Sequence, residues 1–107
     1  MSIKKYANEL GYTDIKPYEV IKVISDKTVV IRRMEAERDP SWKPEWIVGG
    51  FSSICTNQRK QKWIITSSDK WIPIRIRKSK HGQDIWINQG QRFHMSDEPV
   101  NFYDYNF

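Results

Sequence analysis

Apolar and polar side chains alternate most clearly between residues 62 and 80, KWIITSSDKWIPIRIRKSK. Isoleucine and arginine occupy opposite sides of the extended chain there: Ile72, Ile74 and Ile76 on one side, Arg75 and Arg77 on the other. A period of two is typical of a strand with one face on a core and the other in water. We therefore expect a hairpin in which residues 62–66 pair with residues 71–78 and the isoleucine face points inward.

Two further hairpins follow from similar patterns. Residues 18–37 are rich in β-branched side chains on both sides of a tight two-residue turn at 26–27. Residues 84–95 form two short apolar runs about a turn at 89–90. A short strand is also expected at residues 51–56.

The N-terminal residues 2–10 have a helical spacing instead. Ile3, Ala7 and Leu10 recur at i, i+4 and i+7, and Gly11 stands where a helix would end. Because so short a helix is marginal alone, we expect it to dock on the body of the protein.

These elements predict one small domain of the mainly β class. The chain has no strand–helix–strand alternation, which favours a small antiparallel barrel or roll of SH3-like or OB-like size with a short N-terminal helix. We expect the helix within residues 1–11, the barrel within residues 18–95, and an aromatic tail at residues 96–107. The tail should lie across the barrel or complete a surface shared with a partner. The length of 107 residues suits a single core.

Cysteine usage and hydropathy indicate the environment of the protein. Cys55 is the only cysteine, so no intrachain disulfide can form, which suits a reducing cytosol. No run of the sequence approaches the roughly 18 apolar residues of a membrane span. The first ten residues also lack the apolar region of a signal peptide. We expect a soluble, cytoplasmic protein with no membrane partner.

Charge is distributed unevenly along the chain. The net charge is +5, and residues 57–80 contain eight Lys or Arg against one Asp. Residues 93–107 contain three acidic residues and no Lys or Arg. A basic cluster of this kind is a candidate for contacts with phosphate groups, although many charge runs are simply solvated surfaces.

No set of residues meets the requirements of catalysis or of metal binding. Cys55 lies in an apolar stretch without a neighbouring base, and His81, Asp84 and His94 match no strong pattern of metal ligands. The acidic pair at 97–98 precedes a proline and is typical of an exposed turn. We therefore expect a non-enzymatic protein with no catalytic residue, cofactor or metal.

Three segments, YANELGYTDIKPYEV, WKPEWIVGGFSSICTNQRKQKWIIT and PVNFYDYNF, together resemble a family of small uncharacterised proteins of bacteriophages and mobile elements. The likeness spans most of the chain and carries no catalytic motif. It implies expression in the cytoplasm of a bacterial host cell and a role in host take-over or counter-defence through stoichiometric binding.

The first functional hypothesis is nucleic-acid binding through the basic hairpin, with single strands favoured over duplexes. Cations along one face of the sheet would neutralise phosphates, and Trp63 or Trp71 could stack bases beside them. The candidate contacts are Arg59, Lys60, Lys62, Arg75, Arg77, Lys78 and Arg92. The competing interpretation is that the cations form a solvated outer face and that both tryptophans belong to the core.

Two alternative functions depend on aromatic side chains. A bacterial host protein could be bound and inhibited through exposed Trp42, Trp46, Tyr103 and Tyr105, because such residues are typical of interface hot spots. Burial of the two loop tryptophans against a core edge is the commoner outcome. A small nucleotide could instead be sequestered in a pocket lined by aromatic side chains and arginine. An exposed strand edge could also pair two copies into a homodimer.

Overall fold

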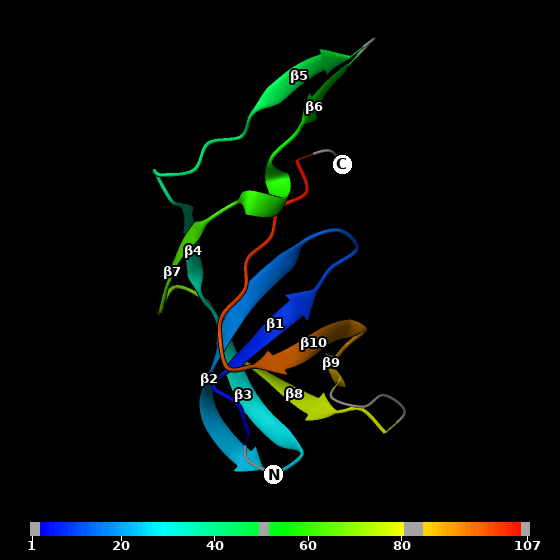
Figure 1. Cartoon of the computed structure of the whole chain (residues 1–107). Helices are drawn as coiled ribbons and strands as arrows, with labels where there is room; N and C mark the ends of the chain where they lie inside the picture. The colour runs from blue at the N-terminus through cyan, green and yellow to red at the C-terminus, as the bar shows by residue number, and fades with distance from the viewer. Residues whose placement is uncertain (1–2, 50–51, 81–84, 106–107) are drawn as a thin grey trace.

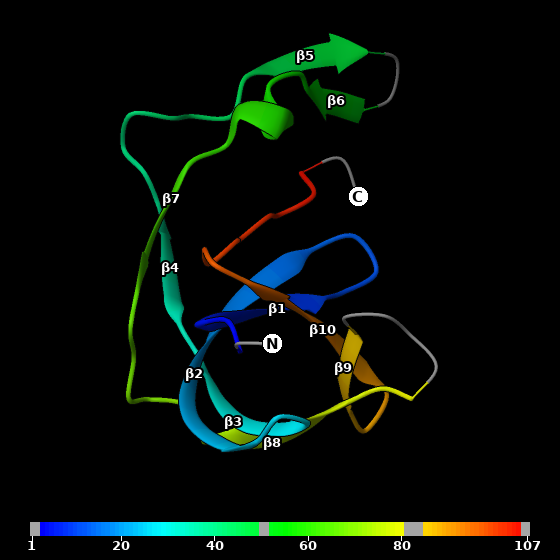
Figure 2. The same ribbon diagram turned by 60° about the horizontal axis from the view of Figure 1, so that its bottom comes forward.

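The computed structural model describes residues 3–49, 52–80 and 85–105, and its centre is a closed antiparallel barrel of six strands (Figures 1 and 2). Around the ring the order is β1, β10, β9, β8, β3 and β2, and β2 pairs with β1 to close it. The strands are β1 Tyr6–Leu10, β2 Ile15–Ser25, β3 Thr28–Arg33, β8 Ile74–Lys78, β9 Ile85–Asn88 and β10 Gln91–Ser96. The small antiparallel β-barrel expected from the sequence is confirmed.

Alternate residues of the barrel strands fill its interior. The side chains with no exposed surface are those of Ala7, Val29, Ile31, Ile76 and Phe93, and Trp86 and Met95 complete the cluster. Burying an apolar side chain of the size of Ile or Phe contributes about 1.5–3 kcal/mol. Closing the sheet also leaves no strand edge of the barrel unpaired.

The hairpin expected at residues 18–37 is confirmed for β2 and β3, but residues 35–37 belong to β4 and pair with β7. The hairpin expected at residues 84–95 is confirmed for β9 and β10, and Asp84 lies outside the described residues. Ser25 pairs with Thr28 across the turn at 26–27, where neither residue has a positive φ. The turn between β9 and β10 is formed by Gln89 with φ 48° and Gly90 with φ 83°. Tight hairpin turns of the primed types need such left-handed residues, because their twist matches that of the strands.

The N-terminal segment is a strand, so the helix expected at residues 1–11 is wrong. β1 pairs with β10 on one side and with β2 on the other. The spacing of Ile3, Ala7 and Leu10 also suits a helix, but a helix of this length would be marginal. As a strand, the segment satisfies its backbone groups on both sides, and Ala7 becomes fully buried.

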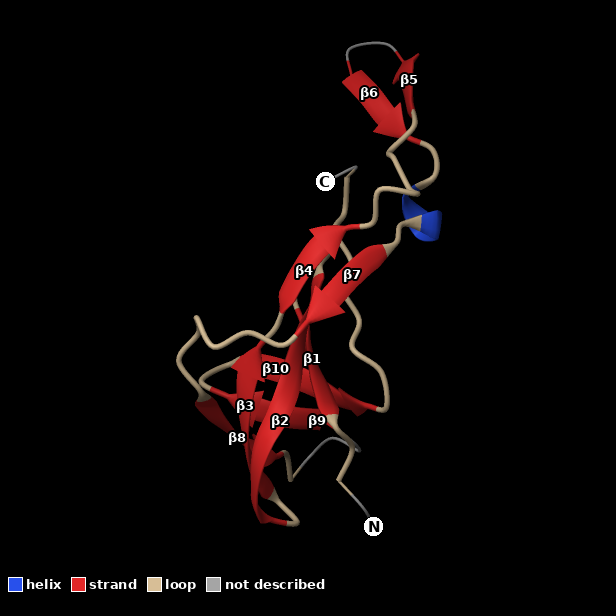
Figure 3. Cartoon of the chain, turned by 90° about the vertical axis from the view of Figure 1, so that its left-hand side faces the viewer, coloured by secondary structure: helices blue, strands red, loops and turns tan. Residues whose placement is uncertain are grey.

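Residues 34–73 leave the barrel between β3 and β8 and form a projecting arm (Figures 1 and 3). In the arm, β4 pairs with β7 and β5 pairs with β6, which makes two separate two-stranded ribbons. The elements are β4 Glu35–Arg38, β5 Trp46–Gly49, β6 Ser52–Cys55, the 3-10 helix η1 Gln58–Lys60, and β7 Trp63–Thr66. The arm makes the molecule elongated, with extents of 51 × 29 × 24 Å. The barrel therefore begins before residue 18 and is interrupted, unlike the continuous span 18–95 that we expected.

The hairpin expected within residues 62–78 is not formed. β7 pairs with β4 in the arm, whereas β8 pairs with β3 and β9 in the barrel. Ile76 is buried as expected, but Ile72 precedes β8 and is 86% exposed. Two strands that are neighbours in the sequence thus belong to different parts of the molecule, because the segment between them returns the chain from the arm to the barrel.

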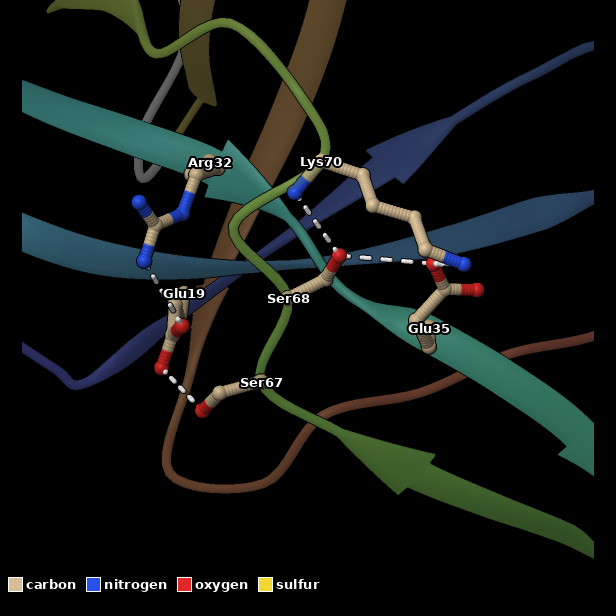
Figure 4. Close-up of polar contacts among 6 residues, drawn as sticks. All are labelled: Glu19, Arg32, Glu35, Ser67, Ser68 and Lys70. Carbon is tan, nitrogen blue, oxygen red and sulfur yellow. Dashed lines mark hydrogen bonds and ion pairs between the residues drawn. The ribbon is translucent and has the colours of Figure 1, made fainter.

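The connection between β7 and β8 is held at the base of the arm by two carboxylates (Figure 4). Ser67 Oγ donates a hydrogen bond to Glu19 Oε2 of β2 at 2.9 Å. Buried Ser68 donates to Glu35 Oε1 of β4 at 3.3 Å, and Lys70 Nζ lies 3.3 Å from the same oxygen. These contacts fix the returning chain both to the barrel and to the first strand of the arm.

The C-terminal tail runs along the barrel and continues to the arm (Figure 1). Val100 N donates to Oδ1 of buried Asn8 at 2.9 Å, and Asn8 Nδ2 donates to Glu98 O at 3.3 Å. Farther on, Phe102 and Ile15 exchange backbone hydrogen bonds of 2.9 and 3.0 Å. The tail is therefore part of the packed structure over its described length.

The tail and the arm meet in a cluster that we call the clasp: Trp42, Trp46, Gln58, Gln61, Tyr103 and Tyr105. The side chain of Gln61 makes two hydrogen bonds with the backbone of Tyr103. Gln61 Nε2 donates to the carbonyl oxygen at 3.0 Å, and Tyr103 N donates to Gln61 Oε1 at 2.9 Å. Tyr105 N donates to Gln58 Oε1 at 2.9 Å. The ring of Tyr105 lies 5.5 Å from that of Trp42 and 4.8 Å from that of Tyr103.

Candidate nucleic-acid interface

Strand pairing places two arginines in one row across the outer face of the barrel. Arg77 of β8 lies opposite Thr28 of β3 and Ile87 of β9, and Arg92 of β10 lies on the other side of Ile87. Residues directly opposite in an antiparallel pair point to the same face. The row is solvent-exposed at Arg77, Ile87 and Arg92. Two strand spacings separate the arginine backbones, about 10 Å.

A second row runs parallel to the first. Arg75 lies opposite Val30 of β3, and Val30 lies opposite Lys22 of β2. Arg75 and Lys22 are both exposed. The two rows thus place four cations on the outer face of β2, β3, β8, β9 and β10. Arg32 of β3 lies on the same face, where it is ion-paired with Glu19 of β2.

At the rim of the barrel this face opens into a groove of about 610 Å³, which we call the basic groove. It is lined by Lys27, Thr28, Arg77, Lys78, Ser79, Lys80 and Ile87. Backbone bonds hold its walls together, since Lys78 N donates to Lys27 O at 2.9 Å and Ser79 N donates to Ile85 O at 2.8 Å. The groove therefore rests on paired backbone; Lys27, Arg77 and Lys80 are solvent-exposed, whereas Lys78 is half-buried.

The basic groove has four cations and two hydroxyl groups in its lining, and no carboxylate among the described residues. The ion pairs found between described residues, which are Lys4–Asp97, Arg32–Glu19 and Lys70–Glu35, involve none of these cations. Asp26 is exposed in the same turn as Lys27 but does not line the groove. Positive charges that line one groove repel one another, so an anion placed between them is favoured.

The predicted nucleic-acid contacts fall into two groups in the structure. Arg75, Arg77, Lys78 and Arg92 lie together on the barrel strands β8 and β10. Arg59, Lys60 and Lys62 lie on the arm, in η1 and just before β7. The basic stretch is therefore not one continuous surface, because its two strands have different partners (Figure 1).

Three cations of this surface were missed by sequence reasoning: Lys22, Lys27 and Lys80. Lys27 was visible as part of a turn, and Lys80 as part of the basic cluster. Their common location depends on β3 lying beside β8, a pairing between segments more than forty positions apart, as Val29 with Ile76 shows. No local pattern in the sequence encodes that neighbour.

Trp63 and Trp71 were expected either to stack bases beside the basic residues or to lie in the core. In the structure they neither line the basic groove nor belong to the core cluster. Trp71 is 40% exposed, with the guanidinium of Arg33 4.5 Å from its ring centroid. Trp63 is half-buried and its Nε1 donates to Gln61 Oε1. Both line a pocket of about 230 Å³ with Arg33 and Lys16. These are the residue types expected for nucleotide capture, but the volume is below the roughly 300–1,000 Å³ usual for ligand pockets.

The aromatic residues proposed to bind a partner protein pack against one another in the clasp. Trp42 is only 6% exposed and Tyr105 is half-buried, so neither presents a free face. Trp46 and Tyr103 keep 48% and 51% of their surface. The expected surface of four aromatic side chains is reduced to two.

The residues considered for catalysis or metal binding are not assembled into a site. Cys55 is buried on β6 in the arm, and its Sγ lies 3.5 Å from Asn57 Oδ1. His94 is on β10 in the barrel, and His81 and Asp84 lie outside the described residues. Within the described ranges, no three His, Cys, Asp or Glu side chains form a group that could hold a metal ion.

No family model, curated protein or solved structure matches this chain. The resemblance to bacteriophage proteins therefore stays a prediction. In the part of the chain that the structure describes, no helix is long and apolar enough to cross a membrane.

Proposed function

We propose that this protein binds nucleic acid by holding its phosphate backbone in the basic groove. The observation that carries the proposal is the lining, which combines Lys27, Arg77, Lys78 and Lys80 with the hydroxyl-bearing Thr28 and Ser79. Lys and Arg neutralise phosphates and release condensed counterions, and hydroxyl groups are common additional contacts to phosphate oxygens.

The exposed arginines beside the groove extend its reach. Arg92 lies across Ile87 from Arg77, and Arg75 lies two positions from Arg77 on the same strand face. A strand leaving the groove would therefore meet further cations on the barrel. Because the described lining has no aromatic side chain, the proposal depends on phosphate contacts and not on base stacking. We expect binding with little sequence preference.

A titration of the protein with single-stranded and double-stranded DNA and RNA at several salt concentrations tests the proposal. If four cations contact phosphates, the logarithm of the association constant should fall against log salt with a slope of about −3. The coefficient per contact is about 0.9 for duplex and about 0.7 for single strands, so the expected slope depends on the form. The form with the higher association constant at a given salt concentration is the one that fits the groove better.

A pair of matched variants separates the groove from net charge. Lys27→Glu with Arg77→Glu reverses two exposed cations of the groove, and Arg59→Glu with Lys60→Glu reverses two exposed cations of the arm. Each pair replaces one lysine and one arginine. We expect the groove variant to bind at least about tenfold more weakly and with a slope smaller by about two, and the arm variant to keep the slope.

Two results would overturn the proposal. One is the absence of binding to any nucleic acid at low ionic strength. The other is an equal loss of affinity and slope in both variants, because the contacts would then not be concentrated in the groove. Circular dichroism spectra and melting temperatures of both variants show that the comparison is made between folded proteins.

A further inference from the structure

The ribbon of β5 and β6 at the far end of the arm has two different faces. Trp46 pairs with Cys55, and Ile47 pairs with Ile54. Cys55 is buried and Trp46 lies 6.1 Å from the ring of Tyr105, so this pair faces the clasp. Successive residues of a strand point to opposite faces. Ile47 and Ile54 therefore form an apolar patch on the outer face, where they are 55% and 46% exposed.

The same region is the longest uncharged run of a highly charged protein. Asp, Glu, Lys and Arg make up 29% of the chain, yet residues 46–58 contain none of them. Natural sheets usually protect an exposed strand edge with charges, especially lysine, or with proline. This ribbon has neither in its strands. Nothing in its sequence opposes close contact with another protein surface.

The ribbon is packed on one of its two faces. A two-stranded hairpin alone is marginal in water, and a third strand or a packed face is generally required. The clasp covers one face of the ribbon, while β5 and β6 pair only with each other. Contact on the Ile47 and Ile54 face would bury its second face as well and add to the stability that the clasp provides.

Charge and position favour a second copy of the chain as the partner. Two molecules of net charge +5 repel each other, and the repulsion is weakest where they meet through an uncharged surface. The ribbon lies at the opposite end of the molecule from β8, β9 and the turn between β2 and β3 (Figures 1 and 3). Contact there keeps the basic barrels much farther apart than the Debye length of about 8 Å.

We propose that the protein is a homodimer in which the Ile47 and Ile54 face of one ribbon packs on the same face of its partner. A two-fold axis makes such an interface self-complementary. The dimer would leave both basic grooves free at its two ends. The inference does not depend on what the grooves bind, although two grooves on one particle would strengthen attachment to a long nucleic acid.

Sedimentation velocity over a range of protein concentrations tests the dimer with matched variants. Ile54 and Ile64 are each 46% exposed, and both lie on strands of the arm. We expect the wild type and Ile64→Lys to dimerise, and Ile54→Lys to dissociate with a dissociation constant at least about tenfold weaker, because lysine brings two positive charges together at the axis. A wild type that remains monomeric at about 100 µM, where micromolar affinities would be saturated, overturns the proposal. Equal dissociation of the two variants overturns it as well.

Hydrogen exchange of the wild type gives a test that needs no variant. Amides of β5 and β6 should exchange more slowly as protein concentration rises, and those of the barrel should not change. The barrel amides serve as the internal control in this measurement. Exchange in the ribbon that is independent of concentration would contradict a dimer formed through it.

Discussion

The barrel and the arm are both built from short antiparallel strands, but they differ in the number of neighbours that each strand has. Every barrel strand is paired on both sides, and the ring encloses side chains such as Ile31 and Phe93 with no exposed surface. Each arm strand has one partner. Apolar side chains that are about half exposed occur in both regions, for example Ile47 and Ile64 in the arm and Val23 in the barrel, so the difference lies in the pairing and in the enclosed core.

The difference indicates two sources of stability in one chain. Apolar burial within a closed sheet stabilises the barrel, whereas the arm depends on contacts with distant segments, namely the tail through the clasp and β2 through Ser67 and Glu19. We therefore expect the barrel to determine global unfolding and the arm to open locally at lower free energy. Three substitutions test this comparison.

The largest effect is expected from Phe93→Ala in the barrel. Phe93 is fully buried and its ring packs edge-on against Tyr18 at a centroid distance of 5.2 Å. Truncation leaves a cavity, and we expect the free energy of unfolding to fall by about 3–5 kcal/mol. Denaturant titration measures this change. Ile64→Ala in the arm is the control and should change it by less than about 0.5 kcal/mol. Similar losses in the two variants would show that the barrel is not the dominant stabilising region.

An intermediate and local effect is expected from Tyr105→Ala in the clasp. The substitution removes the ring contacts of Tyr105 with Trp42, Trp46 and Tyr103. Each aromatic pair contributes about 0.5–1.5 kcal/mol, so the loss of three pairs should lower the free energy of local opening by about 1.5–4.5 kcal/mol. Hydrogen exchange should accelerate in β5 and β6 and remain unchanged in the barrel. Tyr12→Ala, which removes a 99% exposed ring, is the control. A uniform acceleration over the whole chain would mean that the arm and the barrel unfold together.

The smallest effect is expected from Tyr18→Phe, which changes how barrel stability depends on pH. Burial raises the pKa of Tyr18 from 10.0 to about 12, and the negative charge of Glu9 adds to the shift. Because the folded state holds this proton more tightly, the resulting stability is complete below the unfolded pKa and is lost as pH rises from 10.0 to about 12. The stability difference between wild type and Tyr18→Phe should therefore shrink over that interval.

At neutral pH the same substitution should cost about 1 kcal/mol, because it removes the hydrogen bond from Tyr18 Oη to Glu9 Oε1. Equilibrium unfolding of both proteins between about pH 8 and pH 12 measures the two quantities. A difference that stays constant over this range would mean that Tyr18 ionises equally easily in the folded and unfolded states.

Local chemistry made part of the fold predictable. The turn at Gln89 and Gly90 and the β-branched runs about residues 26–27 identify hairpins, because a two-residue turn dictates the pairing of the strands beside it. Alternation correctly places Arg75, Ile76 and Arg77 on opposite faces of one strand. It also makes Arg75 and Arg77 exposed cations whichever strand lies beside them. These features depend only on residues close together in the sequence.

Pairing between distant segments was decided by the tertiary structure. The sequence suits a hairpin of β7 with β8, which would have the shorter loop. It equally suits the observed pairs, in which β7 lies beside β4 and β8 lies beside β3. Closure of the barrel requires β3 and β8 to be neighbours, which moves residues 34–73 into the arm and separates Arg59 from Arg77. It also requires a strand between β10 and β2, which makes the N-terminal segment extended and not helical.

The sequence by itself determined which residues could be strands and which side chains could meet water, because those depend on local geometry. The basic groove and the exposed ribbon exist only because the sheet closes, since closure brings Lys27 beside Lys78 and leaves Ile47 and Ile54 uncovered.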